Sequence, residues 1–298
     1  MTNFQQDRIS GMPSNAEEIK ALLITVNYGS TASLLELLSS LQHLKAFSEI
    51  EIIIVDNSSG DTHAATIREA IAEIPTAELV ESPTNRGYFG AARFGLDHYL
   101  ARGHGLPDWM IVCNHDVVIE DEAFFEKLYV HDPSTVGVLA PRITIASQEV
   151  EQNPFMEERP GWWRQFTMRL YSAAYPLAVT WDWLSRRKRV LLSHTLWGMS
   201  SPRSDGGRRP IYAGHGAFMI FSRKFFDAGG ILDDQLFLFC EEIAIGESCR
   251  SLGLQVVYEP TLAVLHNEHQ SVGNGMSRRV YHYQRRSVRY VLAKYLST

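Results

Sequence analysis

The amino-acid sequence predicts an α/β protein built on a mostly parallel sheet. Short apolar segments alternate with segments whose apolar residues recur at helical spacing, and clusters of turn-forming residues separate them. This alternation is typical of parallel sheets covered by helices, in which ligands bind at the carboxyl ends of the strands. With 298 residues and 45% hydrophobic content, the chain can bury a sizeable core in one large domain.

The first half of the chain shows this alternation most clearly. Four short apolar runs are predicted strands: Ala21 to Val26, Ile50 to Val55, Glu78 to Glu81 and Trp109 to Cys113. Helices are predicted between them, at Ser33 to Leu44, from Thr62 to Ile74, and from the end of the 85–90 loop through Tyr99. Because parallel strands present their carboxyl ends at one edge of a sheet, the loops that begin at residues 27, 56, 85 and 114 should lie together.

The second half is less regular. A strand is predicted at Val136 to Pro141, and an insertion at 142–210 then holds five of the six tryptophans and the basic run Arg186 to Arg189. Two interpretations of the insertion stay open: a pair of helices on a membrane surface, or an aromatic subdomain packed on the core. The predicted organisation is a polar arm at 1–20, one domain at 21–270 that includes the insertion, and a C-terminal helical segment at 271–298.

Composition and charge argue against several classes of protein. The net charge of -6 and the pI near 6.0 predict no nucleic-acid partner. The three cysteines form no CxxC pair and leave one thiol over in any disulfide scheme, which predicts a reducing compartment. No apolar run approaches the ~18 residues of a transmembrane helix, and the first residues lack the apolar segment of a signal peptide. We therefore expect a cytoplasmic protein, either free or at the inner face of the cell membrane.

A first candidate site follows the strand at Trp109 to Cys113, where the sequence is Asn114-His115-Asp116. In an extended segment, Asn114 and Asp116 face the same side. One carboxylate can serve a Mg²⁺ or Mn²⁺ ion, because these ions take other ligands from water and from substrate phosphates. The structural alternative is that Asp116 only caps a helix or forms a turn.

Two further loops offer groups for a nucleotide. Asp56 ends the second predicted strand, where its carboxylate could accept the imide N–H of a uracil or thymine base while Asn57 supports the loop. An Asx-turn is the structural alternative there. Asn85-Arg86-Gly87 opens a glycine-containing turn before a helix, which suits the approach of a diphosphate to the backbone.

Acidic and imidazole side chains follow two later apolar segments. Glu241 and Glu242 come after Leu236 to Cys240, a segment predicted to be buried, and adjacent like charges raise one pKa of the pair, which suits a general base. The alternative is two acids that face the dipole at a helix start. His266 follows the predicted strand Leu262 to Leu265, where an imidazole could bind a metal or a phosphate.

In this order and spacing the motifs resemble the family 2 glycosyltransferases of GT-A fold, particularly the bacterial rhamnosyltransferase-like branch that builds surface polysaccharides. The resemblance covers about residues 21–140 and 211–298. Its anchors are Thr25-Val26-Asn27-Tyr28, Ile54-Val55-Asp56-Asn57-Ser58-Ser59, Asn85-Arg86-Gly87-Tyr88 with Gly90-Ala91-Ala92-Arg93, Asn114-His115-Asp116-Val117, Gly216-Ala217-Phe218-Met219, Phe237-Leu238-Phe239-Cys240-Glu241-Glu242, and His266.

The resemblance implies an inverting enzyme that moves a sugar from a nucleoside-diphosphate donor, with dTDP-L-rhamnose as one candidate, to a hydroxyl of a glycan or lipid-linked acceptor. Residues implied to hold the nucleotide are Thr25, Asn27, Asp56, Asn57, Asn85, Arg86, Gly87 and Asn114. Asp116 and His266 would hold a Mn²⁺ or Mg²⁺ ion, and Gly216 and Ala217 would lie on the acceptor side. Glu242 would be the catalytic base, supported by Glu241, in a single in-line displacement.

Some positions depart from the family pattern. The 114–116 motif offers one carboxylate where many members carry two, Glu replaces Asp at 242, and Ala244 stands where a further acid is frequent. The alternative to an enzyme is a binding protein that kept the fold and lost catalysis, and Ala244 is its best support. A peripheral membrane contact also stays open for the C-terminal segment, whose aromatic and basic residues alternate from Arg278 onward; its alternative is an apolar face packed on the domain.

Overall fold

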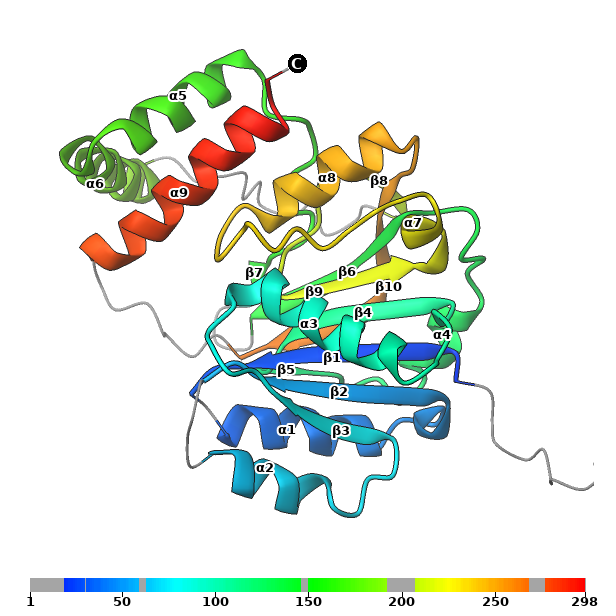
Figure 1. Ribbon diagram of the computed structural model, residues 1–298. Helices are drawn as coiled ribbons and strands as arrows, with labels where there is room; N and C mark the ends of the chain where they lie inside the picture. Colours follow the sequence, from blue (N-terminus) through cyan, green and yellow to red (C-terminus); the bar gives the residue numbers. More distant parts are fainter. Residues whose placement is uncertain are drawn as a thin grey trace, which may run out of the picture.

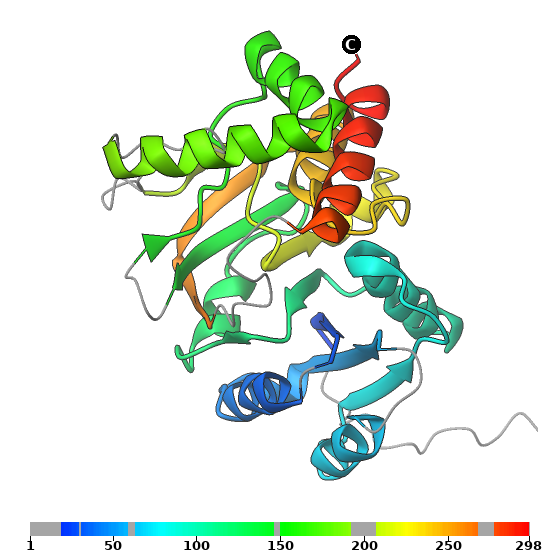
Figure 2. The same ribbon diagram turned by 90° about the vertical axis from the view of Figure 1, so that its left-hand side faces the viewer.

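The computed structural model describes residues 19–29, 31–58, 63–145, 150–191, 207–267 and 277–297. A twisted sheet runs through the molecule with helices on both faces (Figure 1). Three further helices, α5, α6 and α9, gather at one side of the molecule, where Figure 2 shows them packed together. Most of the predicted polar arm, at 1–18, lies outside the described residues.

The four predicted strands of the first half are confirmed to within one residue at each end. They are β1 (Ala21–Asn27), β2 (Ile50–Asp56), β3 (Ala77–Glu81) and β4 (Trp109–Asn114). They pair in the order β3-β2-β1-β4, and all three pairings are parallel. Every residue of β1 is buried, which is why this strand is apolar on both faces except at Thr25 and Asn27 and does not alternate between apolar and polar residues.

The other half of the sheet mixes directions. After β4 come β9 (Phe218–Ser222), β6 (Val138–Ile145), β10 (Val256–His266) and β5 (Val117–Val118). Strand β9 is antiparallel to both β4 and β6, whereas β6 and β10 are parallel. Two short strands, β7 (Val150–Glu151) and β8 (Arg209–Ile211), pair with β6 and β10.

Two strands are longer than predicted. The strand expected at 136–141 begins at Val138 and continues to Ile145, so its second half lies inside the predicted insertion. The strand expected at 262–265 is the end of β10, which begins at Val256. Tyr258, Glu259 and Pro260 interrupt the apolar pattern of β10, and the pairing with β6 shifts register between Glu259 and Ala263, so periodicity alone could not find its start.

Helices cover both faces of the sheet. On one face, α1 (Ala32–Gln42), α2 (His63–Ile71) and α4 (Phe124–Tyr129) bury their apolar side chains against Leu23 and Ile52. On the other face, α3 (Gly87–Ala101) and α8 (Glu241–Ser251) pack with Leu22 and Ile24. A 3₁₀ turn (Phe47–Glu49) precedes β2, and α7 (Arg223–Asp227) follows β9. Helix α3 begins at Gly87, so the predicted 85–90 loop is shorter than expected and its second half is the first helical turn.

The insertion and the C-terminal segment form one helical layer. It consists of α5 (Trp162–Ala173), α6 (Tyr175–Leu191) and α9 (Arg278–Lys294), which contact one another. Val288, Val291 and Leu292 of α9 are buried in a cluster with Leu236 and Ile243, so this apolar face of α9 packs on the protein. Among the described residues, no helix is both long and apolar enough to cross a membrane.

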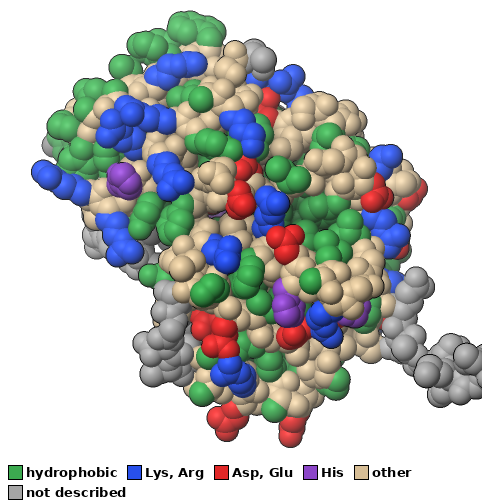
Figure 3. All heavy atoms as spheres, in the orientation of Figure 1, with side chains coloured by type: hydrophobic (Ala, Val, Ile, Leu, Met, Phe, Trp, Pro, Cys, Tyr) green, Lys and Arg blue, Asp and Glu red, His purple; other side chains and the backbone are tan. Residues whose placement is uncertain are grey.

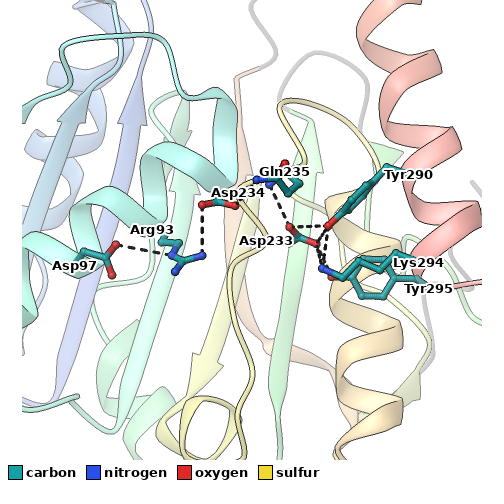
Figure 4. Close-up of polar contacts among 8 residues, drawn as sticks. All are labelled: Arg93, Asp97, Asp233, Asp234, Gln235, Tyr290, Lys294 and Tyr295. Atoms are coloured by element: carbon teal, nitrogen blue, oxygen red, sulfur yellow. Dashed lines mark hydrogen bonds and ion pairs between the residues drawn. The ribbon is translucent and has the colours of Figure 1, made fainter.

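Helix α9 is tied to the 231–240 loop through Asp233 (Figure 4). The buried carboxylate of Asp233 accepts hydrogen bonds from Tyr290 Oη at 2.9 Å, Lys294 Nζ at 2.7 Å and Tyr295 Oη at 2.7 Å. Burial alone would raise the pKa of Asp233, but the bonds from Lys294 and the tyrosines hold it below its usual range. The carboxylate is therefore ionised and fixes the end of α9 to the loop that leads into α8.

The loop itself differs from the buried segment that was predicted. Leu236 and Cys240 are buried, but Leu238 is exposed and Phe237 and Phe239 are half-buried. The backbone carbonyl of Leu238 accepts a hydrogen bond from Ser287 Oγ of α9 at 2.7 Å. The apolar run is thus a loop that helices hold in place, rather than a strand of the core.

We predict that Asp233→Asn lowers the free energy of unfolding by about 1–3 kcal/mol, because the buried cluster loses its charge-assisted bonds and Lys294 loses its counter-ion. Asp234→Asn is the matched control, since its exposed carboxylate accepts from Gln235 Nε2 at 3.1 Å and pairs with Arg93 Nη1 at 3.4 Å without a buried partner, and it should change stability by less than about 0.5 kcal/mol. Urea unfolding of the three proteins measures both effects; equal stabilities for the two variants would contradict the role given to Asp233.

Candidate active site

The predicted loops meet at one edge of the sheet. Asn27 and Asp56 are register partners at the ends of β1 and β2. Strand β9 is antiparallel to β4, so the start of β9 lies beside the end of β4 and brings the loop at 214–217 to the same edge. There Asn114 N donates a hydrogen bond to Ala217 O at 2.9 Å. His266 ends β10 at the same edge, since β10 and β6 run parallel to β4. The strand pairing therefore brings these sequence-distant loops together.

The ends of β1 and β2 carry buried polar side chains. Thr25 and Asn27 alternate along β1 and therefore face the same side of the sheet. Both amide atoms of Asn27 are buried and have no hydrogen-bond partner within the described residues, a costly state for a polar group unless a ligand satisfies it. Asp56 Oδ1 accepts from Ser58 N at 3.1 Å, which is the Asx-turn foreseen as the structural alternative.

The loop before α3 is held in place by Asn57. Its Oδ1 accepts from Arg86 N at 2.8 Å, and its Nδ2 donates to Asn85 Oδ1 at 3.0 Å and to Gly87 O at 3.1 Å. Arg86 donates from Nε to Ser82 Oγ and lies over a phenyl ring at 4.3 Å, with an exposed side chain. The polar atoms of Asn57 are therefore used to shape the loop before α3, whereas the sequence placed Asn57 among the nucleotide-binding residues and in support of its own loop.

Gly87 is the closest contact between this loop and the 231–240 loop. Its φ is +73°, and a Cβ atom there would lie 2.0 Å from Phe237 O, so no other residue fits. The next residue continues the contact, because Tyr88 N donates to Phe237 O at 2.9 Å. Gly87, which the sequence predicted as a position where a diphosphate approaches the backbone, allows the start of α3 to contact the 231–240 loop.

Asp116 and His266 form a pair between β4 and β10. His115 and Asp116 lie in a turn between β4 and β5, not in the extended segment assumed from the sequence. His266 Nε2 is 3.2 Å from Asp116 Oδ1, and His266 Nδ1 is 2.7 Å from Gln152 Oε1. Burial raises the pKa of Asp116, but the hydrogen bond and charge of His266, with the charge of His115, outweigh it and leave the pKa below its usual value.

This pair fits a divalent cation shared with a substrate. Within the described residues no group of three or more His, Cys, Asp or Glu side chains could enclose a metal ion. Asp116 and His266 supply two ligand atoms close together, and Gln152 fixes His266 Nδ1 so that Nε2 faces the carboxylate. Mg²⁺ and Mn²⁺ need little more from a protein when a diphosphate and waters complete the coordination.

Glu241 and Glu242 lie in the first turn of α8, the helix-start position named as their structural alternative. Glu242 Oε1 accepts from Gly216 N at 3.3 Å, and a Cβ at Gly216 would lie 2.9 Å from that oxygen. Burial raises the pKa of Glu242, and burial together with the neighbouring charge of Glu242 raises the pKa of Glu241. The pair therefore holds a carboxylate that can take up a proton near neutral pH.

Tyr88 lies near both the glutamate pair and the Asp116–His266 pair, and no role was predicted for it from the sequence. Its Oη donates to Gly216 O at 2.7 Å. Burial, followed by electrostatic interaction with Cys113, Glu241, Glu242 and Asp116, raises the pKa of Tyr88 well above its usual value, so its hydroxyl stays protonated. Tyr88 is part of the 85–88 motif, so its position was visible in the sequence although its contacts were not.

Two other residues of the site could not be inferred from the sequence. Gln152 directly follows β7 and bonds His266, and no motif in the neighbouring sequence indicates a functional residue there. His215 accepts a hydrogen bond at Nδ1 from Ala217 N at 3.1 Å, and its ring centroid is 6.0 Å from that of His266. Burial and the charge of His266 lower the pKa of His215 to about 3, so it is neutral and shapes the 214–217 loop.

Comparison with known proteins shows the family of the chain. The family model described as glycosyl transferase family 2 matches residues 22–228. The N-acetylglucosaminyl-diphospho-decaprenol L-rhamnosyltransferase of Mycobacterium tuberculosis is 22% identical over 263 residues, which are 84% of this chain and 77% of that protein. The low-salt glycan biosynthesis hexosyltransferase Agl10 of Haloferax volcanii is 22% identical over 247 residues, 83% of this chain and 66% of that protein.

Solved structures share the fold. GalNAc-T7 with UDP, GalNAc and Mn²⁺ has a TM-score of 0.58 at 14% identity, over 84% of this chain and 44% of its own. S. aureus TarS has a TM-score of 0.51 at 14% identity, over 84% of this chain and 37% of its own, so this chain spans less than half the length of either. The protein has the GT-A fold of these glycosyltransferases. Because the family model matches residues 22–228, the chain belongs to family 2 of the glycosyltransferases.

Proposed function

We propose that the chain is a metal-dependent, inverting glycosyltransferase that uses a nucleoside-diphosphate sugar. The observation that carries the proposal is that the Glu241–Glu242 pair and the Asp116–His266 pair both lie beside the 214–217 loop. Glu242 accepts a hydrogen bond from Gly216 N, Tyr88 donates to Gly216 O, and the charge of Asp116 reaches Tyr88. We assign Glu242 as the base and the Asp116–His266 pair as the holder of a metal ion that would anchor a leaving diphosphate.

The nucleotide would bind over the ends of β1 and β2. Asn27 offers a buried amide without a partner in the described chain, and Asp56 offers a buried carboxylate beside it. An amide and a carboxylate together match the donors and acceptors on the edge of a pyrimidine base. Asn57 and Asn85 would act by holding the loop at 85–88, and Arg86 and Asn114 would lie near the phosphates.

The acceptor hydroxyl would meet Glu242. In the proposed step Glu242 takes the proton of the hydroxyl, the oxygen forms a bond to the anomeric carbon, and the bond from that carbon to the diphosphate oxygen breaks with its electron pair. Attack opposite the leaving group inverts the configuration. A Mn²⁺ or Mg²⁺ ion held by Asp116 and His266 would stabilise the charge of the departing diphosphate. Gly216 and Ala217 would border the acceptor.

The relatives suggest which sugar and acceptor to test first. The mycobacterial protein is named as an L-rhamnosyltransferase acting on N-acetylglucosaminyl-diphospho-decaprenol, and the archaeal one as a hexosyltransferase of glycan biosynthesis. We therefore propose dTDP-L-rhamnose as donor and a lipid-linked glycan as acceptor. Thermal stabilisation by dTDP, UDP and GDP with Mn²⁺, followed by sugar transfer from the matching donor, tests this. If no nucleoside diphosphate raises the melting temperature, the nucleotide site is misplaced.

Asp116→Ala should abolish metal-dependent nucleotide binding, because it removes the only carboxylate of the proposed metal pair. Isothermal titration with dTDP in the presence and absence of Mn²⁺ measures the effect. Asp121→Asn, a change of a partly exposed acid that bonds Lys127, is the control and should bind as the parent does. Metal-dependent binding that survives in Asp116→Ala would move the metal site elsewhere.

Glu242→Gln should lower turnover by ~10² or more while donor affinity changes little, which is the scale of a lost general base. Glu241→Gln should lower turnover less, because Glu241 does not bond Gly216. Steady-state kinetics with the transferred sugar measured directly would compare the two. A Glu242→Gln enzyme with parental turnover would assign the base to another group.

The pH dependence of kcat/KM should fall on the acid side with an apparent pKa above the ordinary glutamic-acid value of about 4.3. Burial raises the pKa of Glu242, so lowering the pH protonates the base earlier than it would an exposed carboxyl. Activity is therefore present above the raised pKa and lost below it. A rate that stays constant down to the ordinary value would show that no buried carboxylate controls the step.

A further inference from the structure

The helical layer exposes large apolar side chains to solvent. Trp162 and Trp163 of α5 are 76% and 56% exposed, and Trp183 of α6 is 50% exposed. Trp162, Phe166 and Leu170 recur at every fourth position, so they form a stripe along one side of α5. Further exposed apolar side chains of α6 are Leu177, Val179 and Leu184.

The buried contacts of the layer lie elsewhere. Met168 and Tyr171 of α5 are buried toward the protein, as is Ala178 of α6, which packs with Tyr281 of α9. The stripe of Trp162, Phe166 and Leu170 is therefore the side of α5 that these contacts leave to solvent. An aromatic and aliphatic surface of this kind is typical of a protein that contacts another apolar phase or partner.

Charge in this chain is strongly segregated. The helices α5, α6 and α9 hold twelve of the 28 Lys and Arg residues but only one of the 34 Asp and Glu residues, Asp182. The rest of the chain therefore has sixteen cations against thirty-three acids. The net charge of -6 is the sum of a cationic helical layer and an acidic remainder. Of the described cations in α5 and α9, only Lys294 has a carboxylate partner, Asp233. Figure 3 shows Lys and Arg side chains on this layer next to hydrophobic ones at its outer rim.

A pocket between α5 and α9 combines both features. It has a volume of about 410 Å³ and is lined by Arg169 and Ser172 of α5 and by Arg289 and Leu292 of α9, together with Ala173 and Ala293. Two guanidinium groups above an apolar floor suit a phosphate group that is joined to a hydrocarbon chain. Arg169 and Arg289 are exposed, so such a headgroup could enter from outside.

We propose that α5, α6 and α9 form a docking surface for an anionic lipid bilayer, in which the tryptophans of α5 and α6 enter the headgroup region while the arginines of α5 and α9 bind lipid phosphates. Charge complementarity decides the occupant: cations attract an anionic leaflet, and the acidic remainder of the protein is repelled, which sets the orientation. This inference concerns lipid binding and does not rest on the proposed catalysis.

The docking surface lies next to the candidate active site. Helix α9 holds the 231–240 loop through Asp233 and through Ser287 Oγ, and Phe237 of that loop stacks on Tyr283 of α9 at 4.7 Å. The same loop leads directly into Glu241 and Glu242. A protein docked through these helices would hold its glutamate pair close to the bilayer, where a lipid-linked hydroxyl could reach it.

Vesicle flotation tests the proposal with the full chain and two lipid compositions. Vesicles of phosphatidylcholine alone and vesicles of equal parts phosphatidylcholine and phosphatidylglycerol are compared at low salt and at 1 M salt, where the Debye length falls to about 3 Å. We expect binding to the anionic vesicles at low salt, much weaker binding at 1 M salt, and a blue shift of tryptophan fluorescence on binding. No binding to the anionic vesicles at low salt would overturn the proposal.

Two sets of variants separate the parts of the surface. Arg286→Gln with Arg289→Gln should weaken partitioning into anionic vesicles by about 25-fold, since each cation near the surface contributes a factor of about five. Trp162→Ser, Trp163→Ser and Phe166→Ser combined should reduce the fluorescence shift to the part that Trp183 contributes and weaken partitioning by at least about tenfold. The matched controls are Arg223→Gln and Val130→Ser, exposed residues outside the layer, which should bind like the parent.

The results have defined meanings. Equal losses in the controls and in the layer variants would show non-specific adsorption and overturn the proposal. A concentration-dependent dimer in sedimentation velocity, abolished in the tryptophan variant, would also overturn the proposal if vesicles do not bind. In that case a second copy of the chain would cover the surface. Circular dichroism and sugar transfer to a water-soluble acceptor, measured on each variant, show that the fold is intact. Vesicle binding without any sugar transfer would reject the catalytic proposal and leave this one standing.

Discussion

Parallel pairing of β1 with both β2 and β4 is the constraint on which the rest of the molecule depends. It places Asn27, Asp56 and Asn114 at one edge of the sheet, although the chain separates them widely. The antiparallel strand β9 then adds the 214–217 loop to the same edge, because an antiparallel neighbour begins where β4 ends. A shift of any one strand by one residue would turn the site residues to the opposite face of the sheet.

The loop at 231–240 depends on that sheet only indirectly. Helix α3 contacts it at Gly87, and α9 contacts it at Asp233 and Leu238. It therefore takes its shape from two helices, α3 and α9, that lie far apart in the sequence. The glutamates that follow it owe their position to this arrangement, whereas the Asp116 pair owes its position to strand register.

The sequence was a good guide where burial leaves a simple pattern. The strands β1, β2 and β4 are continuous apolar runs because helices cover both faces of the sheet, and their ends supplied the site residues that could be predicted. Features set by tertiary contacts could not be predicted. Helix α3 begins at a glycine because Phe237 leaves no room for a side chain there, and Gln152 joins the site only through pairing of β7 with β6. Aromatic spacing indicated the helices of the insertion but not which of their faces stay exposed.

Two consecutive residues before the glutamates, Phe239 and Cys240, have left-handed backbone angles, with φ of 73° and 70°. For residues other than glycine, each such conformation costs about 1–3 kcal/mol and persists only where surrounding contacts impose it. The backbone of this short stretch would therefore not adopt these angles without the surrounding contacts. Contacts with α3 and α9 keep this stretch ordered. Local opening of either helix would therefore release the backbone next to Glu241 before the sheet begins to unfold.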